Sequence, residues 1–221
     1  RNGATSFLEQ CVQEGVHIPI CVGGGIRTLD DISLCLRAGA DKVAINTAAI
    51  KNPTFITEAS KRFGCQCIVG SIECIRTETV LGDLNKGALW EPYYDCGRER
   101  SYKDAIAWAK ELQTLGCGEL LVTSIDRDGT RTGLDVELCK SIVTSVTIPV
   151  ICSGGIGSSE DILDLEAGCI ASGVASASLF LYTDETAMSV KQRLNDTGVF
   201  VRNNFVPKTI PSNKSKKDCV L

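Results

Sequence analysis

The sequence predicts an α/β fold in which helices cover a mostly parallel β-sheet. Short runs rich in β-branched residues alternate with helical patterns along the chain, and these runs are almost continuously apolar. Such strands are typical of a parallel sheet covered by helices, either an open doubly wound sheet or a closed (β/α)8 barrel. An internal repeat, described below, favours the barrel.

The apolar runs predict six strands, and a helix over residues 5–15 comes before the first of them. The strands are expected at residues 18–22 (IPICV), 42–46 (KVAIN), 67–73 (CIVGSIE), 119–126 (ELLVTSID), 149–153 (PVICS) and 172–177 (SGVASA). The helices that follow them are expected at residues 29–38, 53–63, 102–115, 136–145, 159–166 and 185–195. Each strand forms a βα unit with the helix after it, which gives six units.

The internal repeat joins the first and the fifth of these units. IPICVGGGIRTLDDI, which begins at Ile18, matches IPVICSGGIGSSEDI, which begins at Ile148. A duplicated half-barrel places such a repeat four βα units apart, which is the spacing found here. Six units cannot close a (β/α)8 barrel, so the first two are expected to be missing from a chain that begins with Arg1.

The barrel is expected to end at Arg202. Residues 1–202 form the N-terminally incomplete barrel domain, and residues 203–221 (NNFVPKTIPSNKSKKDCVL) form a flexible polar tail. Cys219 is third from the end of this tail, whereas a prenylation box needs a cysteine fourth from the end.

The composition excludes several classes of function. The 221 residues carry 23 Lys and Arg against 27 Asp and Glu, so no broad basic surface is expected for nucleic acid or an anionic membrane. No run approaches the roughly 18 consecutive apolar residues of a membrane span, and the start of the chain lacks the apolar stretch of a signal peptide. The expected location is therefore the cytoplasm, and any phosphate site must be local.

The cysteines and the single histidine exclude further chemistry. The twelve cysteines are scattered through strand-like and helix-like segments, where a reduced thiol behaves as a small hydrophobe. Their spacing offers no paired zinc motif, so neither a metal nor another cofactor is expected. His17 falls at the start of a strand, on the stability face of a barrel, and without another histidine no Ser–His or Cys–His nucleophilic pair can form.

Two glycine-rich turns are the candidate phosphate sites. Gly24 and Gly25 lie between a strand and a helix, and Gly154 and Gly155 occupy the equivalent turn of the repeat. Glycines let the backbone approach a phosphate, and the N–H groups at the start of the following helix bind it. Two such sites on opposite sides of a barrel mouth would suit an elongated bisphosphate. The alternative is a pair of tight turns without a ligand.

Short polar residues end two further strands. Asn46 and Thr47 follow one strand, and Ala177 and Ser178 follow the last. Their side-chain and backbone donors would extend the two phosphate sites. Helix capping is the alternative, and the sequence leaves both open.

Carboxylates end two of the central strands. Glu73 closes an apolar strand at the edge of a barrel where catalytic groups are found, so it is a candidate general acid or base rather than only a solvated strand end. Residues 123–133 (TSIDRDGTRTG) make the most polar strand end of the chain, and Asp126 and Asp128 share one face in strand geometry. A simple Asp-Gly turn explains Asp128 and leaves Asp126 unexplained.

These strings together resemble the cyclase subunit of imidazole glycerol phosphate synthase, a (β/α)8 TIM barrel of histidine biosynthesis. The resemblance covers about residues 5–202. It is carried by VGGGIR from Val22, GADKVAINTAAI from Gly39, GELLVTSIDRDGTRTG from Gly118, PVICSGGIG from Pro149 and GVFVR from Gly198. The phosphoribosyl isomerase of the same pathway shares the glycine-rich turns, but INTAA and TSIDRDGT resemble the cyclase.

The resemblance implies a lyase that condenses a bisphosphate, N′-phosphoribulosyl-formimino-AICAR-phosphate, with ammonia to give imidazole glycerol phosphate and AICAR. A glutaminase, as a separate subunit or a fused domain, would supply the ammonia. The motif positions imply one phosphate site at Gly25, Asn46 and Thr47, and a second at Gly129, Gly155, Ala177 and Ser178. Gly24, Gly154, Asp126 and Thr130 lie in the same strings and are assigned to substrate binding. The resemblance places Thr123 and Asp128 beside the reacting centre, with Glu73 as the acid or base.

Two departures keep other functions open. The family uses two catalytic aspartates; the first falls outside this chain, and Glu73 stands where the second is expected. The segment between Glu73 and Trp108 contains LWEPYYDCGRERS, where the family usually has a shorter glycine-rich turn. One alternative is a related barrel that acts with an amidotransferase in the amidation of surface sugars, with which the run 171–174 (ASGV) is compatible. The other is a non-catalytic barrel that binds phosphate ligands or a glutaminase.

Overall fold

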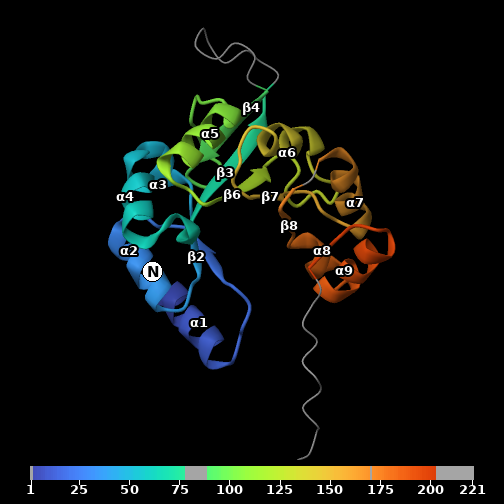
Figure 1. Cartoon of the computed structure of the whole chain (residues 1–221), viewed down its shortest axis with the longest axis horizontal. Helices are drawn as coiled ribbons and strands as arrows, with labels where there is room; N and C mark the ends of the chain where they lie inside the picture. The colour runs from blue at the N-terminus through green and yellow to red at the C-terminus, as the bar shows by residue number, and fades with distance from the viewer. Residues whose placement is uncertain (1, 78–88, 170, 203–221) are drawn as a thin grey trace, which may run out of the picture. The chain divides into compact units, whose positions relative to one another are not determined.

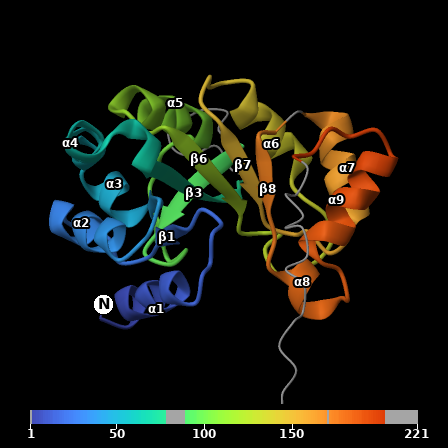
Figure 2. The same ribbon diagram turned by 60° about the horizontal axis from the view of Figure 1, so that its bottom comes forward.

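The computed structural model describes residues 2–77, 89–169 and 171–202. The chain forms two compact units, residues 1–184 and residues 185–221, which are considered separately. The first unit holds a curled parallel sheet with helices along its outer side (Figures 1 and 2). The tail predicted at residues 203–221 lies outside the described residues.

Six strands of the first unit are parallel, as the sequence predicts. In the order in which they pair, they are β1 (Cys21–Gly23), β2 (Lys42–Ile45), β3 (Ile68–Arg76), β6 (Glu119–Ser124), β7 (Val150–Ser153) and β8 (Gly173–Ala175). Among the described residues, β1 and β8 each pair on one side only, so this part of the sheet is open. The α/β class and the parallel order are confirmed; closure into a (β/α)8 barrel and two further βα units stay predictions.

The predicted helices also form, with ends that move by a few residues. They are α1 (Asn2–Gln13), α2 (Leu29–Arg37), α4 (Thr54–Phe63), α5 (Ala105–Leu115), α6 (Val136–Val143) and α7 (Ser159–Gly168). In the second unit, α9 (Ala187–Asp196) is capped at its N-terminus by Thr186, whose hydroxyl accepts a hydrogen bond from the Ser189 amide. Within the described ranges, no helix combines the length and the apolar character that crossing a bilayer requires.

Five short elements of the described chain do not follow from the sequence patterns. Two one-turn helices, α3 (Thr47–Lys51) and α8 (Ser178–Tyr182), and a 3-10 turn at Cys65–Cys67 are too short to show a helical period. An antiparallel hairpin of β4 (Trp90–Tyr94) and β5 (Glu99–Arg100) extends the sheet from β3. Because β4 pairs with residues 73–76, β3 runs to Arg76 and does not end at Glu73 as predicted.

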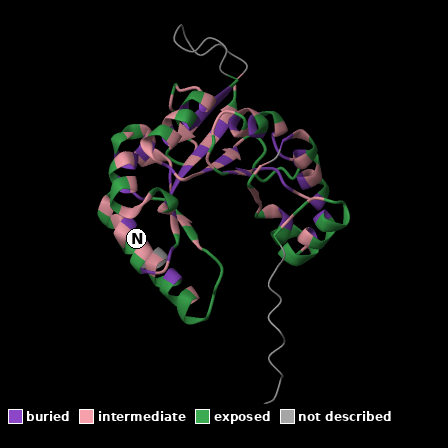
Figure 3. Cartoon of the chain, in the orientation of Figure 1, coloured by how far each residue is buried: buried purple, intermediate pink, exposed green. Residues whose placement is uncertain are grey.

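Burial alternates along the central strands and separates the core from the site. In β6, buried Leu120, Val122 and Ser124 alternate with half-buried Glu119, Leu121 and Thr123. The buried set packs under the helices, where a fully buried Leu or Val contributes about 1.5–3 kcal/mol. Figure 3 shows the buried residues gathered along the sheet and on the helix faces against it. The opposite face of the sheet therefore remains available for polar side chains.

All cysteines of the described residues are free thiols, and several are deeply buried. Burial raises the pKa of Cys117 from its ordinary value of 9.0 to about 12. A thiol whose pKa is higher in the folded than in the unfolded chain stabilises the fold below pH 9, and this contribution disappears as the pH rises toward 12.

We expect the free energy of unfolding to fall above pH 9, by up to about 1.4 kcal/mol per pH unit for each such thiol. Cys117→Ala should make this decline shallower, because it removes one buried thiol from the titration. Cys65→Ala, at an exposed thiol, is the matched control and should leave the slope unchanged. Urea unfolding between pH 7 and 11 measures the slopes; equal slopes in Cys117→Ala and wild type would contradict this account.

Candidate active site

A cavity of about 530 Å³ lies at the carboxyl ends of β1, β2 and β3. It brings together five residues that the sequence assigns to catalysis or phosphate binding: Gly24, Gly25, Asn46, Thr47 and Glu73. Two residues that the sequence analysis did not single out, Asp95 and Cys96, also line it from the β4–β5 hairpin. Catalytic groups of α/β sheets collect at this end of the strands, so the cavity is the candidate active site.

Glu73 owes its position to the register of β3. It lies opposite Thr123 of β6 and opposite Tyr93 of β4, and directly paired residues project from the same face of a sheet. Its neighbours Ile72 and Cys74 point the other way and are buried. Half-buried Glu73 therefore faces the cavity, with the Thr123 side chain on the same face.

The first glycine turn is open to the cavity. Gly24 and Gly25 have φ angles of +95° and +70°, and a Cβ added to either would meet no atom within 4 Å. Among the described residues, neither backbone N–H donates a hydrogen bond that would compete with a ligand. Left-handed backbone beside open space is where a phosphate can approach amide groups closely.

The second glycine turn has the same backbone shape and a different environment. A Cβ on Gly154 would lie 2.6 Å from the Ser124 carbonyl oxygen, and one on Gly155 would lie 2.2 Å from that of Gly133. The Gly155 carbonyl accepts a hydrogen bond of 2.9 Å from the Gly133 amide. Close packing against the loop after β6 therefore explains both glycines without a ligand, and their role in phosphate binding stays a prediction.

The N-termini of α2 and α7, which follow the two glycine turns, are capped by side chains of the protein. The sequence analysis instead expected the N–H groups at these helix starts to bind phosphate. The Asp31 carboxylate accepts hydrogen bonds from the amides of Arg27 and Thr28, at 3.0 and 2.9 Å. Asp161 does the same for the amides of Gly157 and Ser158 in α7. Capping explains why an aspartate occurs at this position in both copies of the repeat. At the first turn, the amides of Gly24 and Gly25 are the backbone donors that remain for a ligand of the cavity.

Asn46 and Thr47 hold the hairpin against the end of β2. The Asn46 side-chain amide donates to the Tyr93 carbonyl at 3.0 Å, and the Thr47 hydroxyl accepts from the Asp95 amide at 3.0 Å. Asn46 makes no side-chain hydrogen bond to cap α3, so capping does not explain it. Its other amide atom, Oδ1, is buried and has no hydrogen-bond partner in the described part of the chain.

The loop after β6 carries the remaining carboxylates and is outside the cavity lining. Asp126 accepts a hydrogen bond of 2.7 Å from the Arg76 amide, which ties this loop to the end of β3. Asp128 is exposed, and the Thr130 hydroxyl donates to the Arg127 carbonyl at 2.7 Å. The substrate roles predicted for Asp126, Asp128, Gly129 and Thr130 thus stay predictions.

Ala177 and Ser178 stand in the same place as Asn46 and Thr47. Each pair connects a strand, β8 or β2, to a one-turn helix, α8 or α3. The structural repeat therefore extends beyond the glycine turns to the next strand. Neither Ala177 nor Ser178 lines the described cavity.

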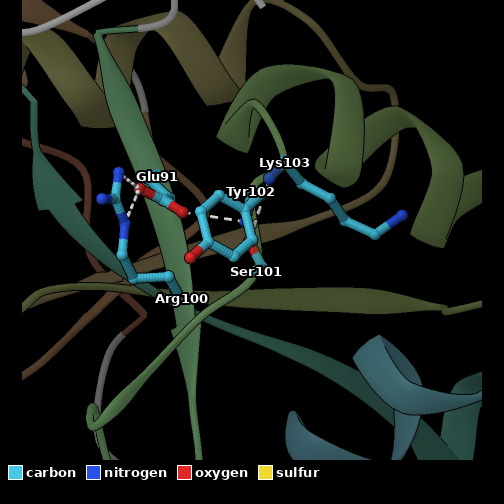
Figure 4. A network of polar contacts seen from close by, with 5 residues as sticks. All are labelled: Glu91, Arg100, Ser101, Tyr102 and Lys103. Carbon is cyan, nitrogen blue, oxygen red and sulfur yellow. Dashed lines mark hydrogen bonds and ion pairs between the residues drawn. The ribbon is translucent and has the colours of Figure 1, made fainter. Parts of the chain in front are cut away.

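The base of the hairpin is fastened by a buried carboxylate (Figure 4). Glu91 is completely buried and accepts three hydrogen bonds, two from the Arg100 guanidinium at 3.0 and 2.7 Å and one from the Tyr102 amide at 2.8 Å. The tip is strained, since Asp95 and Cys96 have φ angles of +53° and +60°. The only sequence signal for this feature is that the segment departs from the expected family pattern.

Cys21 of β1 also lines the cavity and lies near an ion pair of Lys42 and Glu119. Burial raises the pKa of Cys21, Glu119 raises it further, and Lys42 lowers it. The thiol is therefore protonated near neutral pH. No group of three or more metal-binding side chains gathers among residues 2–77, 89–169 and 171–202.

A profile of the family described as "Histidine biosynthesis protein" matches residues 2–186, which is most of the chain. The chain belongs to the histidine biosynthesis protein family. The resemblance found in the sequence is confirmed at this level, as is an enzyme family whose barrel is compatible with the curled sheet. Membership covers both the isomerase and the cyclase types, so the choice between them is a matter of proposed function.

The two glycine turns of this family member should respond differently to substitution. Gly155→Ala should lower the free energy of unfolding by about 3 kcal/mol or more, because it combines left-handed strain with a backbone clash. Gly24→Ala should cost only about 1–2 kcal/mol, the strain alone, and should weaken binding of inorganic phosphate. Urea unfolding and calorimetry measure the two effects. Equal losses of stability would show that the turns are packed alike.

The Glu91 network gives a second prediction. Arg100→Leu should destabilise the chain by about 3 kcal/mol, because it leaves a buried carboxylate with one remaining donor. Adding Glu91→Gln to that variant should restore part of the loss, since the buried group is then neutral. Arg98→Leu, at an exposed position of the same hairpin, is the control. A double variant less stable than Arg100→Leu would mean that the carboxylate charge is not the cause.

Proposed function

We propose that this chain is the cyclase barrel of imidazole glycerol phosphate synthase, the lyase that combines phosphoribulosyl-formimino-AICAR-phosphate with ammonia to release imidazole glycerol phosphate and AICAR. The observation that carries the proposal is Glu73, a half-buried carboxylate on the cavity face of the central strand. It lines the same cavity as the glycine turn, whose amides donate no hydrogen bond to the described residues. A proton-transferring group next to an anion site is what ring closure of a sugar phosphate requires.

The cavity supplies orientation as well as proton transfer. Gly24, Gly25 and Arg27 line the cavity, and their backbone amides and the Arg27 guanidinium would hold a phosphate. A second phosphate is assigned to Gly129, Gly155, Ala177 and Ser178 on the resemblance of their motifs. The distance between two clamped phosphates would fix the reacting carbon and nitrogen atoms relative to Glu73 and Thr123.

Glu73 would act as a proton shuttle in this scheme. Ammonia adds to the formimino carbon of the substrate, cleavage of the bond between that carbon and the AICAR nitrogen releases AICAR, and the ring closes between the new nitrogen and the sugar carbonyl carbon with loss of one water. Each step moves a proton to or from nitrogen or carbon, and a carboxylate can accept it and then return it. A glutaminase subunit or fused domain is the proposed source of ammonia.

A second candidate function is the ammonia-dependent amidation of a surface sugar by a related barrel. The observation in its favour is the β4–β5 hairpin, which lines the cavity with residues the family pattern does not contain. Both functions use ammonia and a phosphorylated substrate. They differ in whether the histidine-pathway bisphosphate is turned over.

The test is turnover of the bisphosphate with ammonium salt by the complete gene product. Glu73→Gln should reduce kcat about 10²–10⁴-fold, the usual contribution of a positioned acid or base. Glu73→Asp should retain part of the activity, because it keeps the carboxylate. Glu58→Gln, at an exposed site on α4, should be unaffected. Bisphosphate binding without turnover in wild type would favour the second function or a non-catalytic barrel, and full activity in Glu73→Gln would refute the role of Glu73.

A further inference from the structure

One wall of the cavity has no role in the proposed reaction. It is made by the tip of the β4–β5 hairpin, where Asp95 and Cys96 line the same space as Glu73. This tip lies far in sequence from the glycine turn at Gly24 and Gly25, which lines the same cavity. The hairpin therefore contributes chemistry that neither the repeat nor the central strands supply.

Asp95 is held in place from both sides. Tyr93, two residues earlier, pairs with Glu73 across the β3–β4 ladder, and the Asp95 amide donates to the Thr47 hydroxyl. The left-handed backbone at Asp95, with φ of +53°, is one that Asp and Asn tolerate better than other side chains. The Glu91–Arg100 pair closes the other end of the hairpin. The backbone of Asp95 is thus held by contacts that leave its carboxylate unused.

The polar groups of the cavity are divided by type. Lining residues that carry donors, namely Gly24, Gly25 and Arg27, come from the segment that follows β1. Acceptors, the carboxylates of Glu73 and Asp95, lie on β3 and the hairpin. Carboxylate oxygens accept hydrogen bonds, so these two side chains suit an N–H group better than a phosphate.

Two acceptors that line the cavity have no donor among the described residues. Asp95 is exposed, and its carboxylate accepts no hydrogen bond from the described residues, although its backbone amide is bonded to Thr47, so the carboxylate is left to solvent or to a ligand. Asn46 Oδ1, at the junction of β2 and the hairpin, is buried without a donor. A buried acceptor without a donor costs about 1–3 kcal/mol, which marks this junction as a place where a ligand or a rearrangement supplies the missing group.

We propose that Asp95 is a specificity-determining residue that accepts hydrogen bonds from a nitrogenous, N–H-bearing part of the substrate, while a phosphate of the same molecule lies against the Gly24–Gly25 turn. This inference rests on the proposed function, because it takes the cavity as the substrate site. It adds a chemical requirement: the ligand must carry an anionic end and a donor-rich end. A sugar phosphate without the nitrogenous part would bind the glycine turn but would give Asp95 no N–H donor.

The test compares two probes that share a ribose phosphate and differ in the nitrogenous part, AICAR and ribose 5-phosphate. Binding of each is measured by calorimetry on the full chain, for wild type, Asp95→Asn and Glu99→Gln. Asn keeps the left-handed backbone and removes the charge, whereas Glu99 is an exposed carboxylate of the same hairpin outside the cavity lining. Asp95→Gly, which also tolerates this backbone, serves as a second variant.

We expect Asp95→Asn and Asp95→Gly to weaken AICAR about tenfold or more, the value of a lost charge-assisted hydrogen bond, and to leave ribose 5-phosphate unchanged. Glu99→Gln should change neither. An unchanged affinity for AICAR in both Asp95 variants would overturn the inference, and so would a parallel loss for both probes, which would indicate a structural role for the tip. If wild type binds neither probe, the proposed function itself fails.

Discussion

The register of β3 is the constraint on which the rest of the site depends. This strand pairs with β2, β6 and β4, and it is the only strand in the described part of the chain with three partners. Because side chains alternate between the two faces, a shift of one residue would move Glu73 under the helices and expose Cys74 to the cavity. Burying a carboxylate in that layer without partners would cost several kcal/mol. The apolar positions Ile68, Ile72 and Cys74 therefore hold the catalytic candidate in place by filling the other face.

The internal repeat places the same backbone turn in two different environments. Both glycine turns have left-handed residues, and in the first turn of both following helices an aspartate accepts hydrogen bonds from the backbone amides just before the helix. At Gly24 the turn faces open space, whereas at Gly155 it packs on the loop after β6. Both copies of the repeat keep the glycines and the capping aspartate that the turn requires. Whether a ligand can approach the turn depends on the segment packed against it, which at Gly154 and Gly155 is the end of β6 and the loop after it. A conserved turn shape is thus weaker evidence for a phosphate site than the space in front of it.

The sequence predicts most of the fold because the relevant signals are local. Apolar runs locate all six parallel strands, and the repeat places β1 and β7 in equivalent units. The hairpin could not be predicted, because β4 has Pro92 and two tyrosines rather than an alternating pattern, and its partner β5 has only two residues. The β4 strand forms because β3 offers it an edge beyond Glu73, which is a tertiary contact. One-turn helices such as α3 are missed for the simpler reason that five residues are too few to show a repeating helical pattern.

The same distinction separates the site residues that could be predicted from those that could not. Glu73 is visible in the sequence because it interrupts an apolar strand, and Asn46 because it ends one. Asp95 looks like an ordinary turn residue, and only its contact with Thr47, 48 positions earlier, brings it to the cavity. Asn46 and Thr47 then have two tasks, since they border the glycine turn and also carry the hairpin. A ligand that moves either residue would move Asp95 with it, so the donor side and the acceptor side of the cavity are mechanically linked through two side-chain hydrogen bonds.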